Sequence, residues 1–257
     1  MPIVDKPALQ YIIEEAVNSG LTDIILVTSP LKSLIEDHFT SETMYDQLLK
    51  ERGKGHLLKD LHDLNGKINI HAVIQDKPLG LGHAVLCAKE AVGNNWFMVF
   101  LPDMLIDSQV PCAAQMINVW NSIHKPIIAT ERAAKEMIPH YGILGVEPMT
   151  SFKKLYKVTQ LVEKPKLEDA PSDFAIMGRY LLPSNIFDCL DSLSSGTGKE
   201  IQLTDALVEL AKSDGMYGYE YDGILHDTGD KLGYLKANLH YAMKSAEYNH
   251  QLKQMVR

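Results

Sequence analysis

The chain has 257 residues, of which 46% are apolar and 23% are charged, and its formal net charge at pH 7 is −8. This apolar fraction is too high for a disordered chain, and no apolar run approaches the roughly 20 residues that span a bilayer. The acidic balance, without a cluster of lysine and arginine, argues against a nucleic-acid partner. We therefore expect a globular protein with neither membrane nor nucleic-acid contacts, which leaves an anionic small molecule open as a ligand.

The three cysteines are Cys87, Cys112 and Cys189. Their wide spacing contains no CxxC pair, so it favours neither a zinc site nor a redox centre. We interpret each cysteine as a small buried hydrophobe. Free thiols, together with the lack of a signal-peptide pattern, predict a protein of the reducing cytoplasm.

The first half of the chain alternates helical and strand-like patterns. Such alternation predicts an α/β fold with an open, mostly parallel sheet and helices on both faces. Ligands of these sheets bind beyond the carboxyl ends of the strands. The expected helices are 7–19, 31–38, 42–64, 82–92 and 109–123, and the expected strands are 23–28, 68–74, 96–101 and 126–130, of which 23–28 and 96–101 have the pattern of buried strands.

The second half has a different texture, which predicts a strand-rich extension of the same domain. There is no internal repeat or low-complexity linker, so residues 1–257 are expected to form a single domain. The expected strands are 143–146, 157–162, 174–182 and 217–221, and the expected helices are 185–193, 203–213 and 231–248.

Gly80 and Gly82 stand directly before the helix expected at 82–92. Two glycines in this position allow a ligand to approach the backbone and leave the first helical N–H groups free. The segment matches neither a Walker loop nor a complete dinucleotide fingerprint. Taken alone, it is described better as an ordinary entry into a helix.

Asp103 follows the strand expected at 96–101. A carboxylate at that position suits a Mg²⁺ that also holds phosphate oxygens, although an N-cap or Asx-turn is about as common there. Asp227 is a candidate second metal ligand if the fold brings it beside Asp103. Asp230, at the start of the last expected helix, is predicted to be an N-cap.

Glu163 and Lys164 close another expected strand. They offer an acceptor for sugar hydroxyls and a cation for phosphate. Neighbouring strand residues point to opposite faces, so both side chains can serve one site only if the chain bends, which Pro165 makes plausible. When the motif is considered alone, a solvated charged turn is the favoured interpretation.

The order of the motifs is more specific than any one of them. The series is Pro2-Ile3-Val4-Asp5-Lys6-Pro7, Gln75 with Pro78-Leu79-Gly80-Leu81-Gly82-His83-Ala84, Leu101-Pro102-Asp103, Tyr141-Gly142, Glu163-Lys164-Pro165, Gly178-Arg179-Tyr180, Gln202-Leu203-Thr204-Asp205-Ala206 and Asp227-Thr228-Gly229-Asp230-Lys231-Leu232-Gly233-Tyr234. From residue 2 to about residue 245, this series resembles the bacterial UTP–glucose-1-phosphate uridylyltransferases, or UDP-glucose pyrophosphorylases.

The resemblance implies the nucleotide-diphospho-sugar transferase fold and the reaction of UTP with glucose 1-phosphate to UDP-glucose and pyrophosphate. It implies a nucleotide-binding part at 1–140, a sugar-binding part with the C-terminal helix at 141–257, and a homo-oligomer. It assigns Gln75, Gly80, Leu81, Gly82 and Pro102 to the nucleotide, Asp103 and Asp227 to Mg²⁺, Gly142, Glu163 and Lys164 to the sugar phosphate, and the catalytic roles to Asp103 and Lys164.

One departure from the family pattern concerns the start of the chain. Members open with an apolar strand and a Gly-x-Gly-Thr-Arg loop that holds the triphosphate, and the 257 residues contain no such motif. We expect the missing strand to belong to the interior of the sheet, and we expect very weak turnover from the chain as given. The alternative is a non-catalytic relative that binds a sugar nucleotide or a protein.

Overall fold

The computed structural model describes residues 1–30, 39, 50–53, 59–194 and 200–255. The helix expected at 31–38 lies outside the described residues. Of the helical pattern at 42–64, α4 (Lys59–Asn65) is the described helix. No helix among the described residues is long and apolar enough to cross a membrane.

The main sheet has six strands, and most of their pairings are antiparallel. Its strand order is β5 (Phe97–Phe100), β10 (Phe174–Leu182), β7 (Ile127–Arg132), β11 (Tyr217–Glu220), β9 (Leu155–Glu163) and β8 (Gly142–Pro148). Within it, β7 and β11 pair in parallel, and the other ladders are antiparallel.

The prediction of a mostly parallel sheet is therefore wrong, and β10 is the reason. This strand lies between β5 and β7 and runs antiparallel to both. It follows that β5 and β7 share one direction, as their helical connection predicts. The parallel unit is present, but a strand from the second half of the chain separates its two members.

A second, two-stranded sheet pairs β3 (Asp23–Thr28) in parallel with β4 (Asn69–Ile74). The prediction that β3 and β5 are buried strands is wrong, because their side chains are mostly half-buried. Within the described part of the chain, each of these two strands pairs along one edge only. A strand needs neighbours on both sides, as β10 has, to become buried along its whole length.

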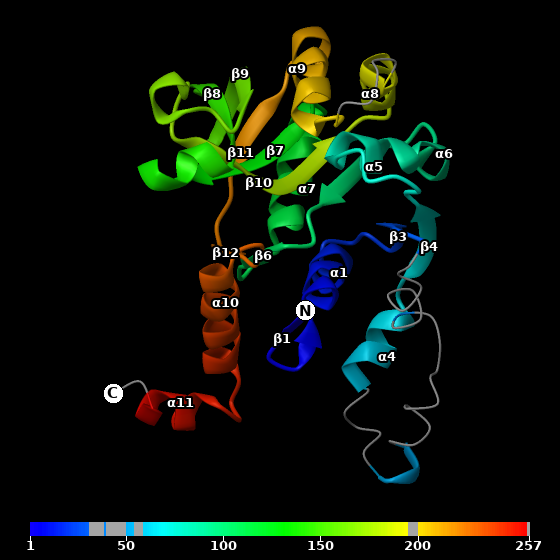
Figure 1. The fold of residues 1–257 in the computed structure, drawn as a ribbon, viewed down its shortest axis with the longest axis vertical. Coiled ribbons are helices and arrows are strands. Elements are labelled where there is room, and N and C mark those ends of the chain that lie inside the picture. Colours follow the sequence, from blue (N-terminus) through cyan, green and yellow to red (C-terminus); the bar gives the residue numbers. More distant parts are fainter. Residues whose placement is uncertain (31–38, 40–49, 54–58, 195–199, 256–257) are drawn as a thin grey trace.

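Helices cover both faces of the main sheet, as predicted (Figure 1). Alternate residues of β10 point to opposite faces. One face is covered by α5 (Leu81–Cys87), α8 (Ile186–Ser194) and α9 (Leu203–Asp214), which pack with Phe174, Ile176 and Leu182. The other face is covered by α7 (Cys112–Ile123), which packs with Ala175 and Met177.

Other helices follow the predictions with changed ends. The N-terminal helix is α1 (Ala8–Asn18), and the helix expected at 82–92 is divided at Ala88 into α5 and α6 (Lys89–Val92). The last expected helix ends earlier, as α10 (Lys231–Lys244), and α11 (Asn249–Met255) follows it. Asp230 caps α10 as predicted, accepting from the N–H groups of Leu232 and Gly233.

Short elements that the sequence patterns did not predict complete the fold. The two that position the site are β6 (Met104–Asp107) and β12 (Ile224–Asp227), which pair antiparallel just before α10 begins (Figure 1). The others are β1 (Pro2–Ile3), β2 (Lys6–Pro7) and the 3-10 turns η2 (Lys135–His140) and η3 (Leu167–Asp169).

Candidate active site

Asp103 and Asp227 lie close together although 124 positions separate them in the sequence. The β6–β12 ladder sets Asp227 opposite Met104, and Thr228 donates to the Asp103 carbonyl through its N–H at 2.7 Å and its hydroxyl at 2.8 Å. A Cβ on Gly229 would lie 3.1 Å from Asp227 Oδ1 and 3.4 Å from Asp103 Oδ2. The glycine thus keeps the space between the two carboxylates open.

The electrostatics of this pair suit a cation. Partial burial raises the pKa of the Asp103 carboxyl above its ordinary value; the nearby Asp227 charge adds to the rise and the Arg179 guanidinium opposes it. Two neighbouring carboxylates repel each other, and a divalent ion between them removes that repulsion. Among the described residues, no three His, Cys, Asp or Glu side chains gather as a metal site, so other ligands would have to come from substrate or water.

Tyr141 connects the carboxylate pair to the second group of predicted residues. Its hydroxyl donates to Asp227 Oδ2 at 2.9 Å. Burial, followed by this hydrogen bond, raises the pKa of the phenol, so Tyr141 remains a donor at neutral pH. Its carbonyl accepts from the N–H of Lys164 at 3.1 Å. One tyrosine therefore joins the metal candidate to the Glu163-Lys164 turn.

Glu163 and Lys164 share one side of the chain because the backbone bends at Lys164, whose φ is +44°. Lys164 Nζ lies 3.9 Å from Glu163 Oε1. Gly142 is the strand partner of Glu163, and a Cβ there would lie 3.2 Å from Glu163 Oε2. Thr204 donates to the same oxygen at 2.6 Å. The bend that both side chains need to serve one site is present, and it lies at Lys164, one residue before Pro165.

Gln75, Gly80 and Gly82 also come together, but the chain itself occupies the space that the glycines create. A Cβ on Gly80 would lie 2.7 Å from the carbonyl oxygen of Ile201, and one on Gly82 would lie 2.8 Å from it. The N–H of Gly82 donates to that carbonyl at 2.9 Å. The expected free N–H at Gly82 is therefore wrong, because the segment before α9 accepts from it.

Gln75 stands beside this turn. Its amide donates to the Gly80 carbonyl at 3.3 Å and lies 3.0 Å from His83 Nδ1. Leu81, which begins α5, is half-buried, and Pro102 is exposed beside Asp103. The predicted nucleotide residues thus occupy two places, the turn before α5 and the end of β5.

Sequence reasoning assigned no role to Tyr141, Thr204 or Thr228. Each stands inside a motif that carried the family resemblance, which was the available signal. Their partners lie 41 to 125 positions away. Contacts over such separations leave no periodic trace in a sequence, so their roles needed the structure.

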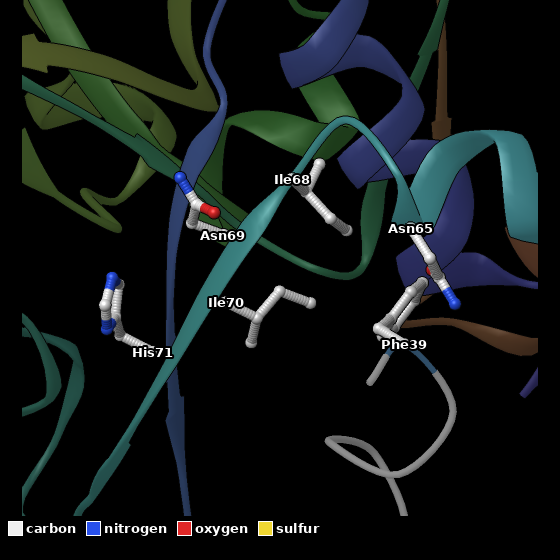
Figure 2. Close-up of a pocket in the computed structure, with 6 residues that line it drawn as sticks. All are labelled: Phe39, Asn65, Ile68, Asn69, Ile70 and His71. Atoms are coloured by element: carbon white, nitrogen blue, oxygen red, sulfur yellow. The ribbon is translucent and has the colours of Figure 1, made fainter. Parts of the chain in front are cut away.

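A separate cavity of about 570 Å³ lies beside β4, away from all of these residues. Figure 2 shows Phe39 and Asn65 next to each other at one end, with Ile70 on the strand and Ile68 directly before it. None of the predicted site residues lines it.

Comparisons with known proteins identify the family. The profile described as "Nucleotidyl transferase" matches residues 1–244. The chain belongs to this family. Within it, the chain is one of the UTP–glucose-1-phosphate uridylyltransferases, since it is 39% identical over all 257 residues to the protein "UTP--glucose-1-phosphate uridylyltransferase 2" of Staphylococcus saprophyticus and covers 88% of that relative.

Solved structures of the family support the same assignment. A UDP-glucose pyrophosphorylase from Acinetobacter baumannii superposes with a TM-score of 0.90 at 37% identity, over 100% of this chain and 89% of that one. A UDP-glucose pyrophosphorylase complexed with UDP-glucose superposes with a TM-score of 0.87 at 34% identity, over 95% and 90%. The resemblance inferred from the motifs is confirmed, as is an α/β nucleotidyl transferase fold.

Proposed function

We propose that this nucleotidyl transferase joins UTP and glucose 1-phosphate to give UDP-glucose and pyrophosphate. The observation that carries the proposal is the Asp103–Asp227 pair, joined through Tyr141 to the Glu163-Lys164 turn. The names of the relatives support the same substrates, since they specify UTP, glucose 1-phosphate and UDP-glucose.

Asp103 and Asp227 are the residues that would hold Mg²⁺. Their oxygens are the hard ligands that this ion prefers, and both side chains are accessible from outside. A Mg²⁺ bound there would neutralise negative charge on the phosphate oxygens of UTP. Tyr141 keeps one Asp227 oxygen in a fixed direction through its hydrogen bond.

The sugar phosphate would lie at the Glu163-Lys164 turn. Glu163 accepts from sugar hydroxyls, Gly142 leaves room for the Glu163 carboxylate beside it, and the exposed Lys164 side chain holds the phosphate. An oxygen of the glucose 1-phosphate phosphate then attacks the α-phosphorus of UTP in line. A new P–O bond forms as the α–β bridging bond breaks, and pyrophosphate leaves with the bonding electron pair.

The base would be read at the turn before α5. Gln75 and the Gly80 backbone carry the polar groups for uracil. Leu81, Gly82 and Pro102 are the other residues that would contact the nucleotide. Residues 1–140 would form the nucleotide-binding part of the domain, and residues 141–257 would form the sugar-binding part.

We also propose a cytoplasmic homo-oligomer. All three cysteines are free thiols, which suits a reducing compartment. On α10, the side chains of Leu232, Leu235 and Leu239 follow helical spacing and are 60%, 63% and 42% exposed. A second copy would remove this apolar surface from water. Sedimentation equilibrium tests the proposal, and a monomer at all concentrations would contradict it.

The direct test of function follows product formation from glucose 1-phosphate with UTP, dTTP or ATP, with and without Mg²⁺. We expect UDP-glucose from UTP and no product after the ion is removed. A non-catalytic relative that binds the sugar nucleotide would instead show UDP-glucose binding in calorimetry without product from any nucleotide.

A further inference from the structure

Arg179 is a fully buried charge beside the candidate active site. It lies on β10, its side chain is 0% exposed, and it pairs with Glu15 of α1, whose side chain is 7% exposed. Burying two ions costs several kcal/mol each unless geometry and further hydrogen bonds compensate. The hydrogen bonds that compensate this cost therefore indicate the role of the Glu15–Arg179 pair.

The guanidinium donates in two directions. Towards α1, Nε and one terminal nitrogen donate to the Glu15 carboxylate, the shortest contact being 2.8 Å. Towards the site, the terminal nitrogens donate to the carbonyls of Met104 at 2.8 Å, Gly178 at 3.1 Å and Leu101 at 3.5 Å. Leu101 and Met104 flank Pro102 and Asp103, so Arg179 holds both ends of the turn that carries the metal candidate.

The backbone of β10 is shaped to aim Arg179 at this turn. Gly178 has a φ of +64°, and the ladder between β10 and β7 shifts register between Ile176 and Tyr180. A Cβ on Gly178 would lie 2.7 Å from Met104 Sδ, so the close approach needs glycine. An irregularity of this kind redirects a side chain beside a site.

Glu15, the other member of the ion pair, is itself held by a further contact. Besides Arg179, its Oε1 accepts from the N–H of Ala113 at 3.2 Å, at the start of α7. The guanidinium also lies 4.9 Å from the Phe100 ring, at the end of β5. Helix α1, helix α7 and strand β10 thus hold the Leu101–Met104 turn through one ion pair.

We infer that the Glu15–Arg179 pair is a positioning device for Asp103: it fixes the Leu101–Met104 turn so that the Asp103 carboxylate stays beside Asp227. The inference rests on the proposed function, in which these two carboxylates hold a divalent ion. A purely structural ion pair would affect folding stability but not the metal affinity of the folded protein.

The test uses Arg179→Lys, which keeps the charge but loses the planar fork, and Glu15→Gln, which leaves the arginine in place. Asp173→Asn is the control, because it breaks an exposed Arg132–Asp173 pair with contacts of 2.8 and 3.0 Å. Mn²⁺ binding is measured by electron paramagnetic resonance below the melting temperature of each variant. We expect about tenfold weaker binding in both site variants and none of this loss in the control.

A double variant, Glu15→Leu with Arg179→Met, separates positioning from stability. Apolar replacement of a buried pair is often neutral or stabilising. We expect this protein to melt near the parent temperature and still to bind Mn²⁺ about tenfold more weakly. Parent-like Mn²⁺ affinity in the double variant, or in both single variants, would overturn the inference.

Hydrogen exchange at the Thr228 amide supplies a readout without metal, since this N–H donates to the Asp103 carbonyl. We expect faster exchange in the variants and unchanged exchange at the Tyr217 amide, which donates to the Pro126 carbonyl directly before β7. Unchanged Thr228 exchange would contradict positioning. If the single variant Asp103→Asn, with Glu15 and Arg179 unchanged, binds Mn²⁺ as the parent does, Asp103 is not a metal ligand. Thr228 exchange alone then decides whether the Glu15–Arg179 pair positions the turn.

Discussion

The backbone of Lys164 has a positive φ, which a lysine adopts only where its surroundings require it. The N–H of this residue donates to the Tyr141 carbonyl, and this bond holds the bend that turns Lys164 towards Glu163. The Lys164 side chain remains 63% exposed, so its ammonium can meet a phosphate from outside.

Lys164→Ala removes that ammonium. We predict a KM for glucose 1-phosphate raised by about tenfold or more with little change in the KM for UTP, because a charged hydrogen bond contributes about 1.5–3 kcal/mol. Steady-state kinetics with each substrate varied in turn measures both values. Lys166→Ala, two residues along the same turn, is the control, and equal effects of the two changes would refute the assigned role.

Tyr141→Phe removes one hydroxyl that donates to Asp227. We predict a higher Mg²⁺ concentration for half-maximal activity, since Asp227 loses its fixed direction. Tyr156→Phe is the matched control, because Tyr156 makes a similar 2.9 Å bond to Glu220. If both changes leave the Mg²⁺ requirement where it was, the link through Tyr141 has no bearing on the metal.

At this scale the sequence predicted residue types better than their partners. Asp103, Glu163 and Lys164 could be chosen because they stand in the ordered motifs that carry the family resemblance, although an Asx-turn or a solvated charged turn would explain each motif alone. The Gly80 and Gly82 geometry could not be predicted, because a glycine that admits a ligand and one that admits the chain's own backbone look alike in a sequence.

The elements that place the site are shorter than the patterns that sequence analysis detects. Strands β6 and β12 have four residues each, so their alternation is too brief to read, yet their ladder brings Asp227 to Asp103. Strand β10 was predicted at its full length. Its place between β5 and β7 was not, because strand order depends on packing between distant segments.

Helix α10 is held to β6 through Asp107, which accepts from Lys244 at 2.6 and 2.8 Å and lies 2.7 Å from His240. Burial alone would raise the pKa of Asp107, but the hydrogen bonds from Lys244 and His240 outweigh it and leave the pKa below its ordinary value. A lowered carboxyl pKa stabilises the folded state above the unfolded pKa of about 3.9, and that stability is lost as the pH falls through the folded pKa.

Lys244→Met therefore lowers the melting temperature at neutral pH, by about 2–4 °C if the ion pair contributes roughly 1 kcal/mol. We predict that the difference shrinks in acid, once Asp107 is protonated in both proteins. Melting curves from pH 7 to about pH 2.5 measure it, with Lys236→Met on the same helix as control. A deficit that is constant with pH would contradict this account of Asp107.

On the scale of the whole molecule, the mixed main sheet carries Gly142 and Glu163, whereas Asp103 and Asp227 lie at the separate β6–β12 ladder. The α/β class and the single family were predictable, because motif order extends over nearly the whole chain. The half-buried state of β3 and β5 was not, since an apolar run shows that a strand can be buried but not that a neighbour covers it.

The 257 residues contain no Gly-x-Gly-Thr-Arg motif, so the contribution of such a loop can be measured by adding it. We predict faster turnover from a version that carries an added strand and Gly-x-Gly-Thr-Arg loop before Met1 than from the 257 residues tested alone. Arginine and backbone N–H groups in such a loop would hold the triphosphate. Pyrophosphate release by the two proteins measures the difference, and equal rates would show that the loop is dispensable.

Single-turnover formation of labelled UDP-glucose from UTP and glucose 1-phosphate, compared between the parent and Asp103→Asn, separates catalysis at Asp103 from binding. We predict product from the parent with Mg²⁺, in the extended version if not in the chain alone. We also predict a rate lower by about 100-fold or more in Asp103→Asn, with UDP-glucose binding little changed. Equal rates in the two proteins, or no product from either version of the parent, would contradict these predictions.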